Sequence, residues 1–404
     1  MAHYEVNVPK KLLPGLLMDK EPLAKLIETI LNQILEAQMT EHLKARPHER
    51  TEDRQGYRNG SRIRTLTTRV GPLTLVVPRS RDGSFSTEIF RRYQRSEQAF
   101  VLALMEMVLQ GVSTRKVKEI TEALCGSSFS RSTVSRLTTE LDAKVFSFLH
   151  RRFEGSFPFL ILDAMFIKVR EEDRVVSRAV LIAVGVNDKG HREVLGLALG
   201  DSESFTSWDD LLKELKGRGL KGVSYVVSDD HTGLARAIQK NLQGALWQRC
   251  QVHLMRNVLG HTPSKLRSEV AHETKLILLA PDRGEARRRL KTFIERFAKT
   301  APKAVACLEE GFEDAMAVMS LPEKYRTRFR STNMLERLNE EIRRRERVIR
   351  IFPNQESAIR LIGAMLVEVH EDWQGKKYLD MEAFYEGDGE RKAAQGNGPV
   401  TLRV

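Results

Sequence analysis

Nine residues near the middle of the chain, Phe159-Leu160-Ile161-Leu162-Asp163-Ala164-Met165-Phe166-Ile167, form an apolar run that a single acid interrupts. Such a run is typical of a buried strand. An ionised carboxylate inside a buried strand is costly unless something compensates its charge. The stretch therefore predicts a sheet core in which Asp163 faces a divalent metal ion.

Two further acids complete a candidate catalytic set. Asp229 ends a second apolar run, 223–228, and Glu336 opens an arginine-rich helical stretch, 335–345. In-line displacement at a phosphodiester benefits from two metal ions about 4 Å apart, and Mg²⁺ prefers oxygen ligands. We expect Asp163, Asp229 and Glu336 to hold two Mg²⁺ ions, for which Mn²⁺ can substitute. Because they are far apart in sequence, folding must bring them together.

Each later acid has rivals. Asp230 competes with Asp229, since either can cap the helix that begins near residue 233. Glu340 and Glu341 compete with Glu336, and a solvated charged helix is the simpler alternative. The helix is predicted to bury Leu335, Leu338, Ile342 and Ile349 and to place Glu336, Asn339, Arg343 and Arg347 on a neighbouring face. On that face, Arg343 and Arg347 are suited to phosphates.

The order of the remaining patterns predicts the fold. Strands are expected at 157–169, 176–187, 192–199, 223–228 and 245–251, with helices at 208–216 and 233–242. Three meandering strands followed by crossover units give a mixed sheet covered by helices. This α/β order describes the ribonuclease-H-like fold, in which the first and fourth strands adjoin. Residues 253–324 have a helical pattern that predicts an all-helical insertion, and a helix at 354–373 closes the core.

The region before the core is expected to bind DNA. A striped helix at 21–43, which either self-associates or packs within the chain, precedes an arginine-rich arm that contains Arg58, Arg62 and Arg64 and two β-like runs at 65–70 and 73–77. Residues 111–141 resemble a helix-turn-helix. The exposed residues of its second helix suit phosphates and base edges; they are Arg131, Ser132, Ser135 and Arg136. A solvated arm without function is the alternative for the arginines.

These patterns divide the chain into six segments. They are the N-terminal helix, arm and small β segment (1–95), the helix-turn-helix (96–150), the first part of the catalytic core (151–252), the insertion (253–324), the second part of the core (325–375) and a tail (376–404).

Composition agrees with a DNA-facing protein. The net charge is +12 and the isoelectric point is about 9.6, which favours nucleic acid or an anionic surface as the partner. No apolar run reaches the ~18 residues that a membrane span needs, and no signal peptide is recognisable. The three cysteines are far apart and fit a reducing interior. We expect a cytoplasmic protein that is nucleoid-associated when bound to DNA, without a membrane.

Cys250 and His253 have the spacing of half a zinc site, but no second pair with matching spacing occurs. Packing and hydrogen bonding at the junction between sheet and insertion is the alternative that we favour. His231, two residues after Asp229, either contacts the site or finishes a turn.

Most of the chain resembles the prokaryotic mutator-type insertion-sequence transposases, relatives of the eukaryotic Mutator elements. The segments that carry the resemblance are 56–60 (GYRNG), 77–83 (VPRSRDG), 111–115 (GVSTR), Asp163 with 168–170 (KVR), 228–234 (SDDHTGL), 250–253 (CQVH) and 331–339 (STNMLERLN).

The resemblance implies an aspartate-aspartate-glutamate triad at Asp163, Asp229 and Glu336, with Arg343 as the basic residue that follows the glutamate. It also implies a homodimer that recognises double-stranded DNA, both the terminal inverted repeats of its own element and target DNA, and that cleaves and transfers strands. Two alternatives stay open: a catalytically silent DNA-binding regulator, and a structure-specific nuclease without strand transfer.

Overall fold

The computed structural model describes residues 20–90, 96–110, 112, 114–125, 141–382, 384 and 385. By its internal contacts the chain divides into two compact units, 1–140 and 141–404. No helix in the described ranges is long and apolar enough to cross a membrane.

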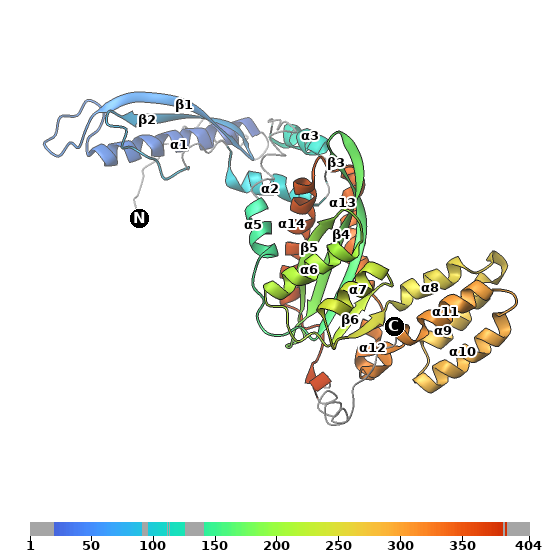
Figure 1. The fold of residues 1–404 in the computed structure, drawn as a ribbon. Helices are drawn as coiled ribbons and strands as arrows, with labels where there is room; N and C mark the ends of the chain where they lie inside the picture. The colour runs from blue at the N-terminus through green and yellow to red at the C-terminus, as the bar shows by residue number, and fades with distance from the viewer. Residues whose placement is uncertain are drawn as a thin grey trace. The chain divides into compact units, whose positions relative to one another are not determined.

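The first unit begins with a long helix packed on a two-stranded antiparallel sheet (Figure 1). Helix α1 (Lys20–Leu43) confirms the helix predicted at 21–43, and strands β1 (Arg58–Thr68) and β2 (Gly71–Ser80) pair around a tight turn. The apolar stripe of α1 packs within the chain against the sheet. The buried residues of this small core are Leu35, Leu66, Leu73, Leu75, Val77 and Phe90.

Strand β1 begins earlier than the sequence predicts. The arm around Arg58, Arg62 and Arg64 was expected to be irregular up to residue 65, but Arg62 pairs with Val77 and Arg64 with Leu75 in the antiparallel ladder. In β2, apolar residues alternate over more of the strand than they do in β1. Pairing with β2 therefore brings polar residues of β1 into the ladder. The arginines therefore lie on a strand.

Two more helices follow in this unit, α2 (Gln98–Leu109) and α3 (Thr114–Cys125). Helix α3 coincides with the first helix predicted for the helix-turn-helix at 114–124. The second predicted helix lies outside the described residues, together with Arg131, Ser132, Ser135 and Arg136.

The second unit contains a mixed five-stranded sheet in the order β5-β4-β3-β6-β7. β3, β4 and β5 form an antiparallel meander, while β6 and β7 run parallel to β3. The first and fourth strands are therefore neighbours, as predicted, and each strand lies within two residues of its predicted bounds. The strands are β3 (Phe159–Glu171), β4 (Arg174–Val186), β5 (Arg192–Gly200), β6 (Tyr225–Ser228) and β7 (Leu246–Arg249).

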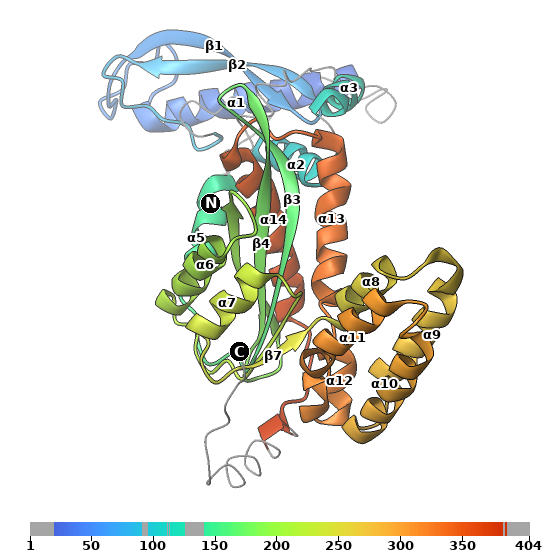
Figure 2. The ribbon, with the colours of Figure 1, turned by 45° about the vertical axis from the view of Figure 1, so that its right-hand side comes forward.

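Helices cover both faces of this sheet (Figure 2). On one face, α6 (Phe205–Gly217) and α7 (Thr232–Asn241) pack on side chains such as Leu160 and Leu162 of β3. Because side chains alternate along a strand, Asp163 points to the other face. That face meets three helices, α5 (Leu141–Leu149), α13 (Asn333–Ile349) and α14 (Gln355–Gln374).

A helical segment stands between β7 and α13 and has its own apolar core. It confirms the helical pattern predicted within residues 253–324. Its α-helices are α8 (Gln251–Gly260), α9 (Arg267–Leu278), α10 (Arg283–Phe297) and α11 (Pro302–Ala315), and α12 (Glu323–Phe329) leads on to α13.

Candidate active site

The register between β3 and β6 brings two of the predicted acids together. These strands are parallel, and Ile161 lies opposite Val227. The same offset separates Asp163 from Asp229, so Asp229, one residue beyond β6, lies level with Asp163. Neighbouring strands are about 4.8 Å apart. The β3–β6 pairing ends two residues before each acid, so its register, continued, puts both acids at the same height of the sheet.

Asp163 is enclosed and has one direct partner. Its side chain is 6% exposed, and Nδ2 of Asn339 on α13 donates to its Oδ2 at 2.8 Å. Burial raises the pKa of Asp163 to about 7, opposed by nearby His253 and reinforced by the charges of Asp229 and Glu336. The ionised carboxylate is costly in this place, as expected for a group that meets a cation.

The start of α13 is tied to the end of β7. The backbone N–H and the hydroxyl of Thr332, a fully buried residue, donate to Sγ of Cys250 at 3.4 and 3.5 Å. The N–H of Gln251 donates to the carbonyl of Arg330 at 2.9 Å, and that of Glu336 to Thr332 at 3.0 Å. Cys250 therefore anchors the helix turn that carries Glu336.

His253 lies between Cys250 and the acids. Its neighbour Cys250 raises the pKa of His253 to about 9 against the effect of burial, with Asp163 and Asp229 adding to the rise. Burial raises the pKa of Cys250, but His253 and Thr332 outweigh it and the net shift is downward. The two residues pack at the junction of sheet and insertion.

Glu336 is held by residues of α8. Its Oε1 lies 2.8 Å from NH1 of Arg256 and 3.7 Å from Nε2 of His253. The contact with Arg256 is an ion pair without hydrogen-bond geometry, since Oε1 has no hydrogen-bond partner. The charge of Glu336 thus acts on Asp163, while its carboxylate pairs with the guanidinium of Arg256 on α8.

A fourth acid, Glu203, was missed by sequence reasoning. It precedes α6, is largely buried, and its Oε1 lies 3.9 Å from Nδ1 of His231. Burial raises the pKa of Glu203, and the charge of Asp229 adds to this. In the sequence it is an ordinary acid before a helix N-cap, Ser204, so no local pattern marks it.

Gly233 explains how Glu203 comes close to the turn that follows β6. A Cβ at Gly233 would lie 2.5 Å from the backbone N of Phe205 and 2.8 Å from the carbonyl carbon of Ser204. Only a glycine allows the first turn of α7 to pack this closely on the segment before α6. The close approach sets Glu203 beside the turn that contains His231.

The rival acids are engaged elsewhere. Oδ2 of Asp230 lies 2.7 Å from NH1 of the buried Arg249. Glu341 pairs with Arg344 and Arg345, and Glu340 is exposed. The helix buries Asn339 and Arg345 in addition to the predicted Leu335, Leu338 and Ile342, whereas the predicted Ile349 is only half-buried.

The donor atoms suit a divalent cation, but they do not yet converge. Oδ1 of Asp229, Oε1 of Glu336 and Oε1 of Glu203 are buried without a hydrogen-bond partner, which is costly for oxygen atoms unless a ligand meets them. In the described ranges, no three His, Cys, Asp or Glu side chains already lie close enough together to hold a metal ion. Metal binding by these acids would therefore require side-chain movement.

The arginines predicted to contact DNA differ in their exposure and in their contacts within the protein. NH2 of Arg58 donates to Oγ1 of Thr40 at 2.8 Å, and the guanidinium of Arg64 lies 4.4 Å from the ring centre of Phe90. Arg62 is exposed on β1, and Arg343 and Arg347 are exposed on α13.

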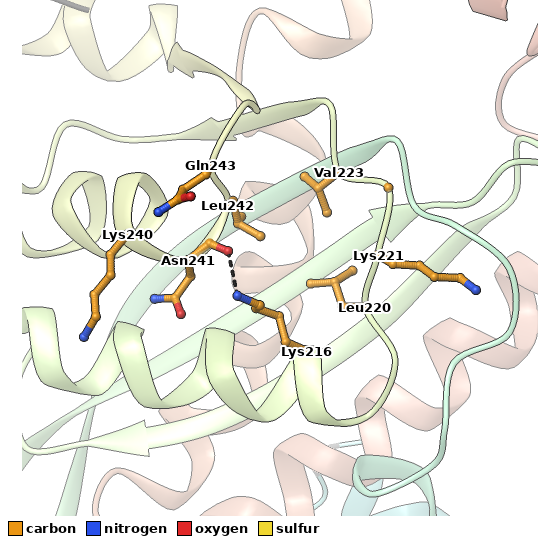
Figure 3. Close-up of a pocket in the computed structure, with 9 residues that line it drawn as sticks. Lys216, Leu220, Lys221, Val223, Lys240, Asn241, Leu242 and Gln243 are labelled. Atoms are coloured by element: carbon orange, nitrogen blue, oxygen red, sulfur yellow. Dashed lines mark hydrogen bonds between the residues drawn. The ribbon is translucent and has the colours of Figure 1, made fainter.

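A cavity of about 520 Å³ lies at the opposite end of β6 from Asp229, and Lys216, Lys221 and Lys240 are among its lining residues (Figure 3). Nζ of Lys216 donates to the carbonyl of Asn241 at 3.0 Å, and Lys240 pairs with Asp209 at 3.0 Å. Both lysines lie in the last turns of helices, where cations satisfy the terminal carbonyls. These contacts account for Lys216 and Lys240 structurally.

Comparison with known proteins identifies the relatives of this chain. Residues 12–376 match the family model described as "Transposase, Mutator family". The transposase for insertion sequence element ISRM5 of Rhizobium meliloti is 48% identical over 91% of this chain and 92% of its own length. The transposase for IS256 in transposon Tn4001 of Staphylococcus aureus is 44% identical over 88% and 93%. The transposase for IS406 of Burkholderia multivorans is 41% identical over 88% and 92%. The chain therefore belongs to the Mutator family of transposases and is a transposase of an insertion sequence.

Proposed function

We propose that this transposase binds the terminal inverted repeats of its own element and catalyses cation-dependent cleavage and strand transfer at Asp163, Asp229 and Glu336. The alignment of Asp163 with Asp229 across β3 and β6 carries the proposal. The strand order, with Glu336 on a helix after an all-helical insertion, supports a ribonuclease-H-like catalytic core.

Two bound Mg²⁺ ions, or Mn²⁺ in their place, would supply positive charge to the attacking and leaving oxygens of the phosphodiester. The protein's own part is positioning. Asp163 and Asp229 present oxygen ligands from fixed backbone, and Glu336 adds a third from α13. Asn339 donates to Oδ2 of Asp163 and so holds the carboxylate in one orientation.

The basic residues are assigned to DNA. Arg343 and Arg347 project from α13 beyond Glu336 and would contact backbone phosphates near the cleaved bond. In the first unit, Arg62 on β1, with Arg58 and Arg64, and the predicted helix-turn-helix would hold the element ends, and the protein would act as a homodimer on double-stranded DNA.

The test separates chemistry from binding. Asp163→Asn, Asp229→Asn and Glu336→Gln should each reduce cleavage and strand transfer in Mg²⁺ by about 10³-fold or more, because each removes a charge that positions a cation. Binding of the element ends in a mobility-shift assay should remain near the wild-type level. Asp210→Asn, an exposed acid on α6, is the matched control and should keep full activity.

Full strand transfer by Glu336→Gln would remove that residue from the mechanism. A wild-type protein that binds ends but cuts nothing in Mg²⁺ or Mn²⁺ would be a silent regulator. One that cuts but yields no joined product with target DNA would be a nuclease.

A further inference from the structure

Helix α8 presents two cationic side chains to Glu336. His253 and Arg256 are three residues apart on α8 and so share one face of the helix. Both approach the same carboxylate oxygen, Oε1 of Glu336. The two differ in accessibility: the side chain of His253 is 24% exposed, whereas that of Arg256 is 60% exposed. Arg256 can therefore reach Glu336 and solvent from the same position.

The ion pair is easily exchanged. Oε1 of Glu336 is buried, but Arg256 is mostly exposed and the contact lacks hydrogen-bond geometry, so the pair contributes little to stability. A phosphate accepts two parallel N–H bonds from a guanidinium and is a stronger partner than a carboxylate held at an unfavourable angle. A DNA strand that enters the site would meet Arg256 at the surface.

The pair also competes with cation binding. While Oε1 of Glu336 faces Arg256, the described acids do not converge on one point. The positive charge of Arg256, 2.8 Å from the carboxylate of Glu336, repels a divalent cation that approaches the same group. Whatever draws Arg256 away thus frees Glu336 to join Asp163 and Asp229.

We propose that Arg256 is a DNA-phosphate contact that occupies Glu336 in the DNA-free protein and releases it when a phosphate binds. The inference rests on the proposed function, because it takes Glu336 as a cation ligand. Since linkage is reciprocal, DNA would tighten cation binding and the cation would tighten DNA binding. The helical insertion thereby gains a role: it couples the arrival of DNA to assembly of the metal site.

The sign of one measurement distinguishes this role from a structural one. If Arg256 merely supports Glu336, its loss should weaken cation binding. If Arg256 competes for Glu336, its loss should strengthen cation binding to the DNA-free protein. Arg256→Gln removes the charge, keeps a polar side chain, and changes an exposed position.

The experiment is a titration of the full-length protein with Mn²⁺, followed by electron paramagnetic resonance, with and without a short duplex of random sequence at low salt. Without DNA, Arg256→Gln should bind Mn²⁺ about two- to fivefold more tightly than the wild type, the range expected from losing a weak ion pair whose arginine is exposed. With DNA, the wild type should gain affinity and Arg256→Gln should gain less. Arg267→Gln, an exposed arginine on α9, is the matched control and should behave as the wild type.

Unchanged or weaker Mn²⁺ binding by Arg256→Gln would overturn the inference and leave the proposed function intact. Glu336→Gln and Asp163→Asn, run beside it, test the foundation. If neither of them weakens Mn²⁺ binding, the proposed metal site fails, and the inference fails with it.

Discussion

The three acids of the candidate site are held in two different ways. Asp163 lies in β3 and Asp229 directly follows β6, so the pairing of these two neighbouring strands brings them close. Glu336 lies on α13, which follows the helical insertion. Side chains hold it in place: Cys250 contacts Thr332 at the start of α13, and Arg256 pairs with Glu336 at the surface. Strand pairing makes a rigid half of the site, whereas a helix held by side chains makes an adjustable half.

The contrast predicts unequal tolerance of side-chain length. Asp163→Glu inserts a methylene into a packed, buried position, so it should cost about 1–3 kcal/mol of stability and at least about 10²-fold in cleavage rate. Glu336→Asp should lower cleavage without a comparable loss of stability, because the half-buried helix surface accommodates the shorter chain. Denaturant melts beside a cleavage assay measure both, and equal destabilisation by the two changes would refute the contrast.

Gly233→Ala tests how the rigid half is supported. The new Cβ would meet backbone atoms of Ser204 and Phe205, which cannot rotate away, so we expect a loss of about 1–3 kcal/mol in the free energy of unfolding. Gly217→Ala, in α6 with open space around it, is the control and should leave the melting temperature nearly unchanged. Equal melting temperatures of Gly233→Ala and the wild type would show that this close approach is not needed.

The pH dependence of stability tests the burial of Asp163. Its pKa is raised from 3.8 to about 7 in the folded protein, so between about pH 4 and pH 7 the folded state keeps a proton that the unfolded state has lost. Stability therefore falls as pH rises through this window. In metal-free buffer, Asp163→Asn should be more stable than the wild type at pH 8, by about 1–3 kcal/mol, and equal to it near pH 4.

Thermal melts with a chelator across this pH range measure the difference. Asp210→Asn, at an exposed acid, should follow the wild type throughout. Parallel curves for Asp163→Asn and the wild type would mean that the carboxylate ionises without penalty.

Local patterns were sufficient for the strand order and for the location of Asp163 in one strand and of Asp229 at the end of its neighbour. An acid inside an apolar run, and another at the end of one, can be recognised in the sequence because buried strands have characteristic hydrophobic patterns. The start of β1 at Arg58 was missed because its partner strand, rather than its own composition, brings those residues into the ladder.

No local sequence pattern indicates the positions of Glu203 and Arg256 or the contact between Cys250 and Thr332. Each depends on residues distant in sequence: Glu203 on His231 and Gly233, Arg256 on Glu336, and Cys250 on a residue 82 positions away. The sequence around one residue does not show which distant residue it will contact in the folded protein.

The sequence by itself determined the sheet, the helical excursion, the basic character and the family, since all of these are written in composition, periodicity and contiguous motifs. Only the tertiary structure decided that Glu336 faces Arg256 and that a fourth acid stands beside Asp229. The physical reason is that side-chain charges interact through space over a few ångströms, and which charges come that close is set by packing between segments that are far apart along the chain.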